Sequence, residues 1–287
     1  MSDELSPRRH GEAFDEVAAD YDRSRPTYPG GLIDRAYRIA GLARGDRVLE
    51  IGCGSGQLTR DLVARGLRVT AVEPGSRLAS LAARNLEGTG RVELVNARFE
   101  DAELPGEPFR AVFSASAFHW IDPGVSWRKA ADTLLPGGTL ALLQYCGLEE
   151  ERSARYQSAL LAALARTVPE IAADWPAYRD LAGTIAGAEL RRGNVSEVWA
   201  WLCTHDVARA QAGELFCDVR IAALPVLLEQ TADELNALLR THSFYRRITP
   251  AQRRALESES AALYERLGRP IRSSTVAVLV TARRSGG

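Results

Sequence analysis

The sequence predicts an α/β protein built on a doubly wound, mostly parallel sheet of seven strands, with a helical cap inserted into it. Apolar runs with strand character alternate with helical periodicity between about residues 46 and 146, which is typical of a parallel sheet. The stretch "GCGSG" stands between the first strand and the first helix of this series. Strand character returns in residues 217–230 and 273–283, after a long segment that has only helical or irregular patterns.

The first two strand and helix units are defined by short apolar runs and by residue spacing. "DRVLEIG" (46–52) predicts a buried strand, and "QLTRDLVARG" (57–66) has apolar residues at helical spacing before a glycine that ends the helix. "RVTAVEP" (68–74) predicts the second strand, with Glu73 at its end, and "SRLASLAARNL" (76–86) predicts the second helix.

Three more strands follow along the chain. They are predicted at "RVELVNARF" (91–99), "FRAVFSASAF" (109–118) and "GGTLALLQY" (137–145). Between the last two, "SWRKAADTLLPGG" predicts a helix that is stopped by Pro136 and the two glycines after it. Five strands in this order indicate the first part of an open sheet.

The change of pattern along the chain predicts four regions. We expect an N-terminal arm over residues 1–35, a cofactor-binding α/β core over 36–146, a helical cap over 147–215, and completion of the sheet with helices and a terminal strand over 216–287.

Composition excludes several classes of function. The formal net charge of the 287 residues is -1, so there is no strong field to hold a nucleic acid or an anionic membrane. The four cysteines form no CxxC pair, so no metal cluster is predicted. No stretch is apolar enough to span a bilayer. We therefore expect a cytoplasmic protein with a small-molecule partner, no nucleic acid and no membrane; a homo-oligomer stays open.

The glycine-rich turn and Glu73 together predict a binding site for an adenosine-like ligand. Gly52, Gly54 and Gly56 fall where a strand becomes a helix, so the backbone there is accessible to a ligand. Glu73 ends the next strand, where a carboxylate can accept hydrogen bonds from two ribose hydroxyls. A structural tight turn is the alternative explanation for the glycines alone.

Glycine spacing separates two classes of cofactor. Dinucleotide-binding turns have the pattern G-x-G-x-x-G, whereas here the third glycine comes one position early. Glu50 also precedes the first glycine by two residues, and a carboxylate there suits an ammonium group better than a diphosphate.

The pattern E-x-G-x-G-x-G resembles the first motif of class I S-adenosylmethionine-dependent methyltransferases. The resemblance continues through "VTAVEP", "RFEDAELP", "FSASAFHWID" and "LLPGGTLALL", in the order of the family. The segment "FDEVAADYDRSRPTYP" and the "AFHW" after the fourth strand are similar to bacterial small-molecule methyltransferases of the trans-aconitate and natural-product types. The resemblance implies a Rossmann-like methyltransferase fold, S-adenosylmethionine as cofactor, S-adenosylhomocysteine as product, and a function in secondary metabolism.

The same resemblance implies a set of cofactor-binding residues. Backbone contacts are implied for the three glycines and ribose contacts for Glu73. Glu100 is implied on the adenine amino group beside Phe99, and Ser116 and Ala117 beneath the methionine part. The full set is Arg25, Glu50, Gly52, Gly54, Gly56, Glu73, Phe99, Glu100, Ser116 and Ala117.

The stretch "YDRSRPTYP" predicts an ordered arm, because Pro26 and Pro29 interrupt any helix that begins before it. The resemblance implies that this arm covers the methionine end of the cofactor, with Arg25 on the carboxylate and Tyr21 near the sulfonium. Tyr28 is then a candidate for contact with the acceptor. A surface arm whose aromatic residues only fill grooves is the alternative.

Together with Tyr21, His119 is a candidate catalytic residue, as a base or as a group that positions the acceptor. It follows the fourth strand, at the edge where open α/β sheets place their chemistry. Trp120, Tyr145 and His242 are further candidates for acceptor contact. A structural, hydrogen-bonded imidazole is the alternative for both histidines.

The predicted function is methyl transfer to oxygen, nitrogen or carbon of a small molecule, by in-line displacement in a capped pocket. Two alternatives stay open at this point. One is an NAD(P)-dependent oxidoreductase, which the glycine spacing disfavours, and the other is a non-catalytic protein that binds the cofactor and a partner.

Overall fold

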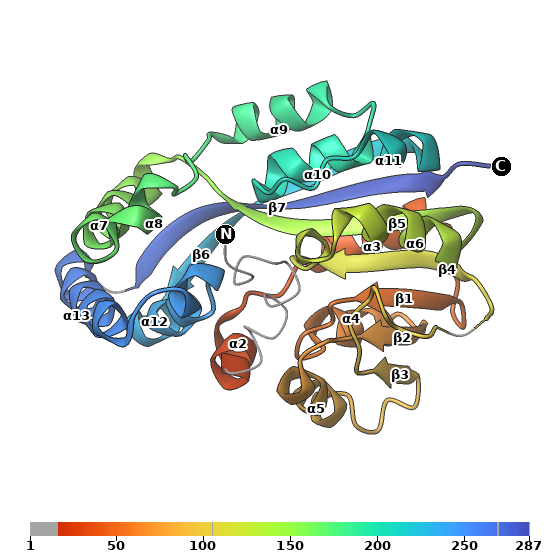
Figure 1. Ribbon diagram of the computed structural model, residues 1–287, viewed down its shortest axis with the longest axis horizontal. Helices are drawn as coiled ribbons and strands as arrows, with labels where there is room; N and C mark the ends of the chain where they lie inside the picture. Colours follow the sequence, from red (N-terminus) through yellow and green to blue (C-terminus); the bar gives the residue numbers. More distant parts are fainter. Residues whose placement is uncertain (1–16, 105, 269, 287) are drawn as a thin grey trace.

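The computed structural model describes residues 17–104, 106–268 and 270–286, and a seven-stranded sheet runs through it (Figure 1). The strand order is β3-β2-β1-β4-β5-β7-β6. β7 is antiparallel to both of its neighbours, and the other pairs are parallel. This confirms the predicted fold class. The strands are β1 Arg47–Ile51, β2 Arg68–Val72, β3 Val92–Val95, β4 Phe109–Ala115, β5 Leu134–Gly147, β6 Phe216–Gln230 and β7 Ile271–Arg284.

Each central strand is buried on both faces, which explains its continuous apolar sequence. In β1, Val48 and Leu49 are both fully buried but belong to different core clusters, because successive side chains of a strand point to opposite faces. Helices cover both faces of a parallel sheet, so neither face of its strands is exposed to solvent and neither needs polar side chains.

The helices lie in layers on the two faces of the sheet. One face packs against α3 Gly30–Ile39, α4 Gln57–Ala64 and α5 Ser76–Asn85. The other packs against α6 Pro123–Thr133, α10 Val195–Cys203 and α11 Ala210–Leu215, and α9 Leu181–Leu190 lies over α10 (Figure 1).

A second group of helices stands beyond one end of β6 and β7 (Figure 1). We call this group the cap; it consists of α7 Glu151–Thr167, α8 Pro169–Ala173, α12 Ala232–Arg240, η5 Ser243–Arg246 and α13 Pro250–Leu267. Its core joins Leu160 and Leu164 of α7 to Leu239 of α12 and Leu256 of α13. The structure thus divides the predicted cap region 147–215: α7 and α8 join helices from between β6 and β7, whereas α9 to α11 cover the sheet.

The helix before β5 ends earlier than its sequence predicts. α6 ends at Thr133, and Leu134 is already extended, with ψ of 148°. The physical reason is Pro136, which disfavours a helical conformation at the residue before it, so the chain leaves the helix early and enters β5.

The arm consists of α2 Ala18–Ser24 and the non-helical residues 25–29. α2 ends before Pro26, as the two prolines predict, but Tyr21 lies within the helix. Residues 1–16, with the start of "FDEVAADYDRSRPTYP", lie outside the described residues. Among the helices that are described, none is both long enough and apolar enough to cross a membrane.

Candidate active site

A cavity of about 470 Å³ opens at the carboxyl ends of β1, β2, β4 and β5, beneath the arm and the cap. All of the predicted site residues except Gly56 line it. The carboxyl ends of parallel strands meet at one edge of a sheet, and this sheet places its cavity where such folds bind ligands. Gly56 is the N-cap of α4, and a Cβ there would approach Leu86 Cδ1 to 2.9 Å.

The turn after β1 needs glycine for two reasons. Gly52, Gly54 and Gly56 all have positive φ, at 70°, 57° and 87°. A Cβ on Gly52 would overlap the Cβ of Ala117, and one on Gly54 would lie 3.1 Å from Cε1 of Tyr21. The turn therefore packs between the residues that follow β4 and the arm, and side chains at Gly52 or Gly54 would collide with them.

Glu73 shapes the glycine turn from the end of β2. Its carboxylate accepts hydrogen bonds from the backbone N–H groups of Gly54 and Gly75, each at 2.9 Å. The side chain is only 4% exposed. Each carboxylate oxygen has more than one acceptor position, so a carboxylate that binds these amides can also accept from ligand hydroxyls.

Glu50 is a buried carboxylate without a full set of partners. It is 1% exposed, and its Oε2 has no hydrogen-bond partner among the described residues. Burial raises the pKa of Glu50 to about 8. A buried acceptor that faces a cavity is a site for a cation or a donor, since leaving it unsatisfied costs free energy.

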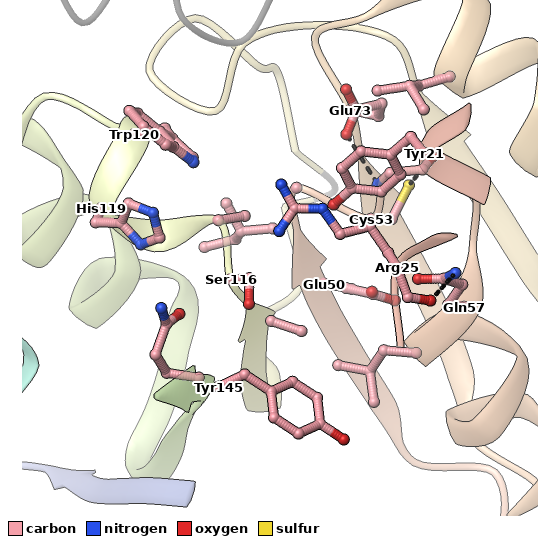
Figure 2. Close-up of a pocket in the computed structure, with 18 of the residues that line it drawn as sticks. Tyr21, Arg25, Glu50, Cys53, Gln57, Glu73, Ser116, His119, Trp120 and Tyr145 are labelled. Carbon is pink, nitrogen blue, oxygen red and sulfur yellow. Dashed lines mark hydrogen bonds between the residues drawn. The ribbon is translucent and has the colours of Figure 1, made fainter. Parts of the chain in front are cut away.

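Arg25 extends into the cavity between Tyr21 and His119 (Figure 2). Its Nη2 donates to the backbone carbonyl of Thr241 at 2.8 Å, and the guanidinium lies 5.2 Å from the centre of the Tyr21 ring. Its Nε is buried and has no acceptor in the described part of the chain. A guanidinium with an unused donor suits a carboxylate ligand.

The arm is fastened to the glycine turn by Gln57, the residue that follows it. Nε2 of Gln57 donates to the carbonyls of Asp22 and Arg25, at 3.3 and 3.2 Å. The first residue of α4 therefore fixes the chain that covers the cavity.

The end of β4 has a strained conformation supported by tyrosines. Ser116 has φ of 51°, and its Oγ lies 2.6 Å from the hydroxyl of Tyr28. The Tyr28 ring stacks on Tyr145 with centroids 4.8 Å apart, and the Tyr145 hydroxyl donates to the carbonyl of Thr27. Strained backbone of this kind concentrates at functional sites.

His119 belongs to a group of rings at the cavity wall. Its ring centre lies 4.7 Å from Trp120 and 4.6 Å from His205. Burial and the nearby His205 and Arg25 hold its pKa well below the usual range. Its Nδ1 is buried and unpartnered among the described residues. The imidazole is thus neutral, with an unused polar atom inside the site.

Phe99 and Glu100 lie at the far wall of the cavity. Phe99 is buried beside Lys129, whose Nζ lies 5.3 Å from the ring centre. The Glu100 carboxylate accepts from Arg98 at 3.0 Å and from the backbone N–H of Asp122 at 3.2 Å.

Several residues that line the cavity were not predicted from the sequence. His205 comes from the loop after α10, and Leu238 and Thr275 come from α12 and β7. No local pattern links these segments to the site, because only the folding of the cap brings them there. Gln57 and Gln144 could have been predicted from the sequence, because each is a polar residue next to a predicted site residue.

Sequence comparisons with known proteins match this chain to methyltransferases. A family model described as a methyltransferase domain matches residues 49–142. An uncharacterized methyltransferase of Mycobacterium tuberculosis is 37% identical over 131 residues, which are 46% of this chain and 51% of that protein. The chain therefore matches about half the length of that relative.

A second relative is covered more fully. An uncharacterized methyltransferase of Geobacillus kaustophilus is 30% identical over 177 residues, 57% of this chain and 78% of that protein. Among solved structures, a protein of Anaeromyxobacter dehalogenans described as a type II methyltransferase has a TM-score of 0.57 and 24% identity. That likeness covers 92% of this chain and 99% of the other, and it shows that the two share a fold.

Proposed function

Because the chain belongs to the class I S-adenosylmethionine-dependent methyltransferases, we propose that it transfers the methyl group of S-adenosylmethionine to a small molecule held in the capped cavity. The observation that carries this proposal is the pair of buried polar atoms without partners among the described residues in one cavity, Oε2 of Glu50 and Nε of Arg25.

These two groups fit the amino-acid end of S-adenosylmethionine, the cofactor of the family. An α-ammonium satisfies the unpartnered oxygen of Glu50, and an α-carboxylate satisfies the unused Nε of Arg25. A diphosphate offers no cation or donor to the unpartnered oxygen of Glu50, which disfavours the nicotinamide alternative. In this proposal the cofactor also contacts the backbone of the turn at Gly52 and Gly54, and its ribose contacts Glu73.

When bound, the cofactor supplies an electrophilic methyl group: a lone pair of the acceptor forms the new bond, the electron pair of the broken carbon–sulfur bond stays on sulfur, and the acceptor loses its proton. The chain's own contribution is to hold the reactants in line and to exclude water. Such positioning is worth roughly 7 to 11 kcal/mol of the barrier.

Tyr21 and His119 have separate proposed roles. Tyr21 lies on Gly54 and can stabilise a cation through its ring face, an interaction worth about 0.5 to 2 kcal/mol. His119, half-buried and neutral, can accept the proton of a weakly nucleophilic acceptor or hold that acceptor in place. Phe99 and Glu100 are proposed on the adenine, Ser116 and Ala117 beneath the methionine part, and Tyr28, Trp120, Tyr145 and His242 on the acceptor.

A small molecule is favoured as acceptor because the cavity is covered by the arm and the cap. The net charge of -1 also provides no field for a nucleic acid. We place the reaction in the cytoplasm, as the composition suggests.

One experiment tests the proposal. The purified chain is incubated with S-adenosylmethionine carrying an isotopically labelled methyl group and with a metabolite extract, and products are read by mass spectrometry. We expect one compound to gain a labelled methyl group. Tight binding of the cofactor without any labelled product would favour the alternative of a non-catalytic binding protein.

A further inference from the structure

A second cavity of about 310 Å³ adjoins the first. It lies between the cap and the strands β5, β6 and β7, and we call it the chamber. Its volume is in the range of sites for small organic ligands. Six residues line both spaces: Gln144, Tyr145, Leu228, Leu238, His242 and Thr275.

The chamber wall is aromatic and has little charge. Tyr156, Trp175 and Tyr178 line it, and none of the described residues that line it is an aspartate or a glutamate. Arg179 brings the only charge among them. Its guanidinium lies 3.7 Å from the centre of the Trp201 ring, and it donates to the Trp201 carbonyl at 3.3 Å. The guanidinium thus lies against the Trp201 ring, and the chamber offers aromatic faces to the rings of a ligand.

The shared wall offers hydrogen-bond acceptors. Nδ1 of His242 lies 2.9 Å from the carbonyl oxygen of Leu238. A carbonyl only accepts, so Nδ1 holds the proton, and Nε2 of a neutral imidazole is an acceptor. Burial lowers the pKa of His242 to about 4, which keeps it neutral near pH 7. Oε1 of Gln144 is buried, and the described residues provide it with no partner.

We propose that the methyl acceptor is an uncharged, ring-containing molecule whose rings lie in the chamber and whose hydroxyl group meets Gln144 and His242 at the wall shared with the capped cavity. The inference rests on the proposed function, since it names the substrate class of that site. A hydroxyl satisfies the buried acceptors of the shared wall, whereas a carboxylate or phosphate would face them with further acceptors. The rings then stack within the aromatic wall.

Binding of three matched probes tests the substrate class. The full chain is saturated with S-adenosylhomocysteine and titrated calorimetrically at pH 7 with 2-naphthol, 2-naphthoate and naphthalene. We expect 2-naphthol to bind at least tenfold more tightly than either of the others. If S-adenosylhomocysteine binds and 2-naphthol does not, or if 2-naphthoate binds more tightly, the substrate class is wrong while the proposed cofactor site stands. If S-adenosylhomocysteine fails to bind, the proposed function fails as well.

Two variants locate the binding. Ala177 is exposed and lines the chamber, so Ala177→Trp fills it. Ala173 is also exposed but does not line it, and Ala173→Trp is the matched control. We expect only Ala177→Trp to weaken 2-naphthol binding, by at least tenfold, with binding of S-adenosylhomocysteine kept. Gln144→Leu should reduce the preference for 2-naphthol over naphthalene severalfold. Equal effects of the two tryptophan variants, or an unchanged preference in Gln144→Leu, would overturn the assignment.

Discussion

Asp20 of the arm accepts a hydrogen bond from Nε of Arg240 in the cap, at 2.7 Å, although 220 residues separate them in sequence. Arg25 makes a second connection, to the carbonyl of Thr241. On its other side the arm is bonded to Gln57, next to the glycine turn. The arm thus links the proposed cofactor site to the cap.

Removing the Asp20–Arg240 pair should weaken cofactor binding modestly. Both side chains are partly exposed, at 24% and 29%, and such pairs contribute about 0.2 to 1 kcal/mol. Arg240→Leu should therefore lower affinity for S-adenosylmethionine up to about fivefold by calorimetry. Arg65→Leu, which breaks the 2.7 Å pair with Asp34 away from the cavity, is the control. Equal losses in the two variants would argue against a role of the arm.

Glu73→Ala should reduce cofactor affinity sharply. The change removes two charge-assisted hydrogen bonds to the glycine turn, each worth about 1.5 to 3 kcal/mol, as well as the proposed ribose contacts. We expect a loss of at least about tenfold in titrations with S-adenosylmethionine. Glu93→Ala, at an exposed position of β3, is the control. Unchanged affinity in Glu73→Ala would contradict the ribose role.

Gly54→Ala tests the close contact between the turn and the arm. A left-handed conformation costs a non-glycine residue about 1 to 2 kcal/mol, and here the new Cβ also lies 3.1 Å from Tyr21. Gly88→Ala is a matched control, with φ of 77° and nothing within 4 Å of the new Cβ. Both variants should lower the melting temperature, but only Gly54→Ala should weaken cofactor binding. A similar binding loss in both would rule out a local effect at Tyr21.

Cofactor binding should release a proton from Glu50. The pKa of Glu50 is raised to about 8 in the fold, so its contribution to stability is present below the unfolded pKa and is lost as pH rises toward 8. Near pH 7 the carboxyl is mostly protonated, and a cation beside it lowers its pKa. Titrations in buffers of different ionisation enthalpy should show uptake of close to one proton by the buffer, and Glu50→Gln should abolish it. Buffer-independent heats in the unmodified chain would exclude this linkage.

His119→Ala should lower turnover more than cofactor binding. General acid–base catalysis contributes about 10²- to 10⁴-fold, so we expect at least a 10²-fold loss of turnover with the identified acceptor and little change in cofactor affinity. Because the pKa of His119 lies well below 6.5, turnover should show no loss from its protonation between pH 6 and 8. Full activity in the variant would make His119 a structural residue.

Local features of the sequence predicted the sheet well. All seven strands lie where apolar runs and flanking turns placed them, because burial on both faces leaves a continuous apolar signal. The helix α6 ends earlier than predicted because Pro136 acts on the residue before it. The residues of the glycine turn were recognisable because their positive φ angles restrict the residue type.

The sequence by itself determined the fold class, the places of the first five strands along the chain and the cofactor family, since periodicity, glycine and proline act over a few residues. Only the tertiary structure decided which distant groups meet. It brought Tyr28 to Ser116, His205 to His119 and Arg240 to Asp20. Such pairs leave no local pattern, because each depends on how whole layers pack rather than on the residues beside it in the chain.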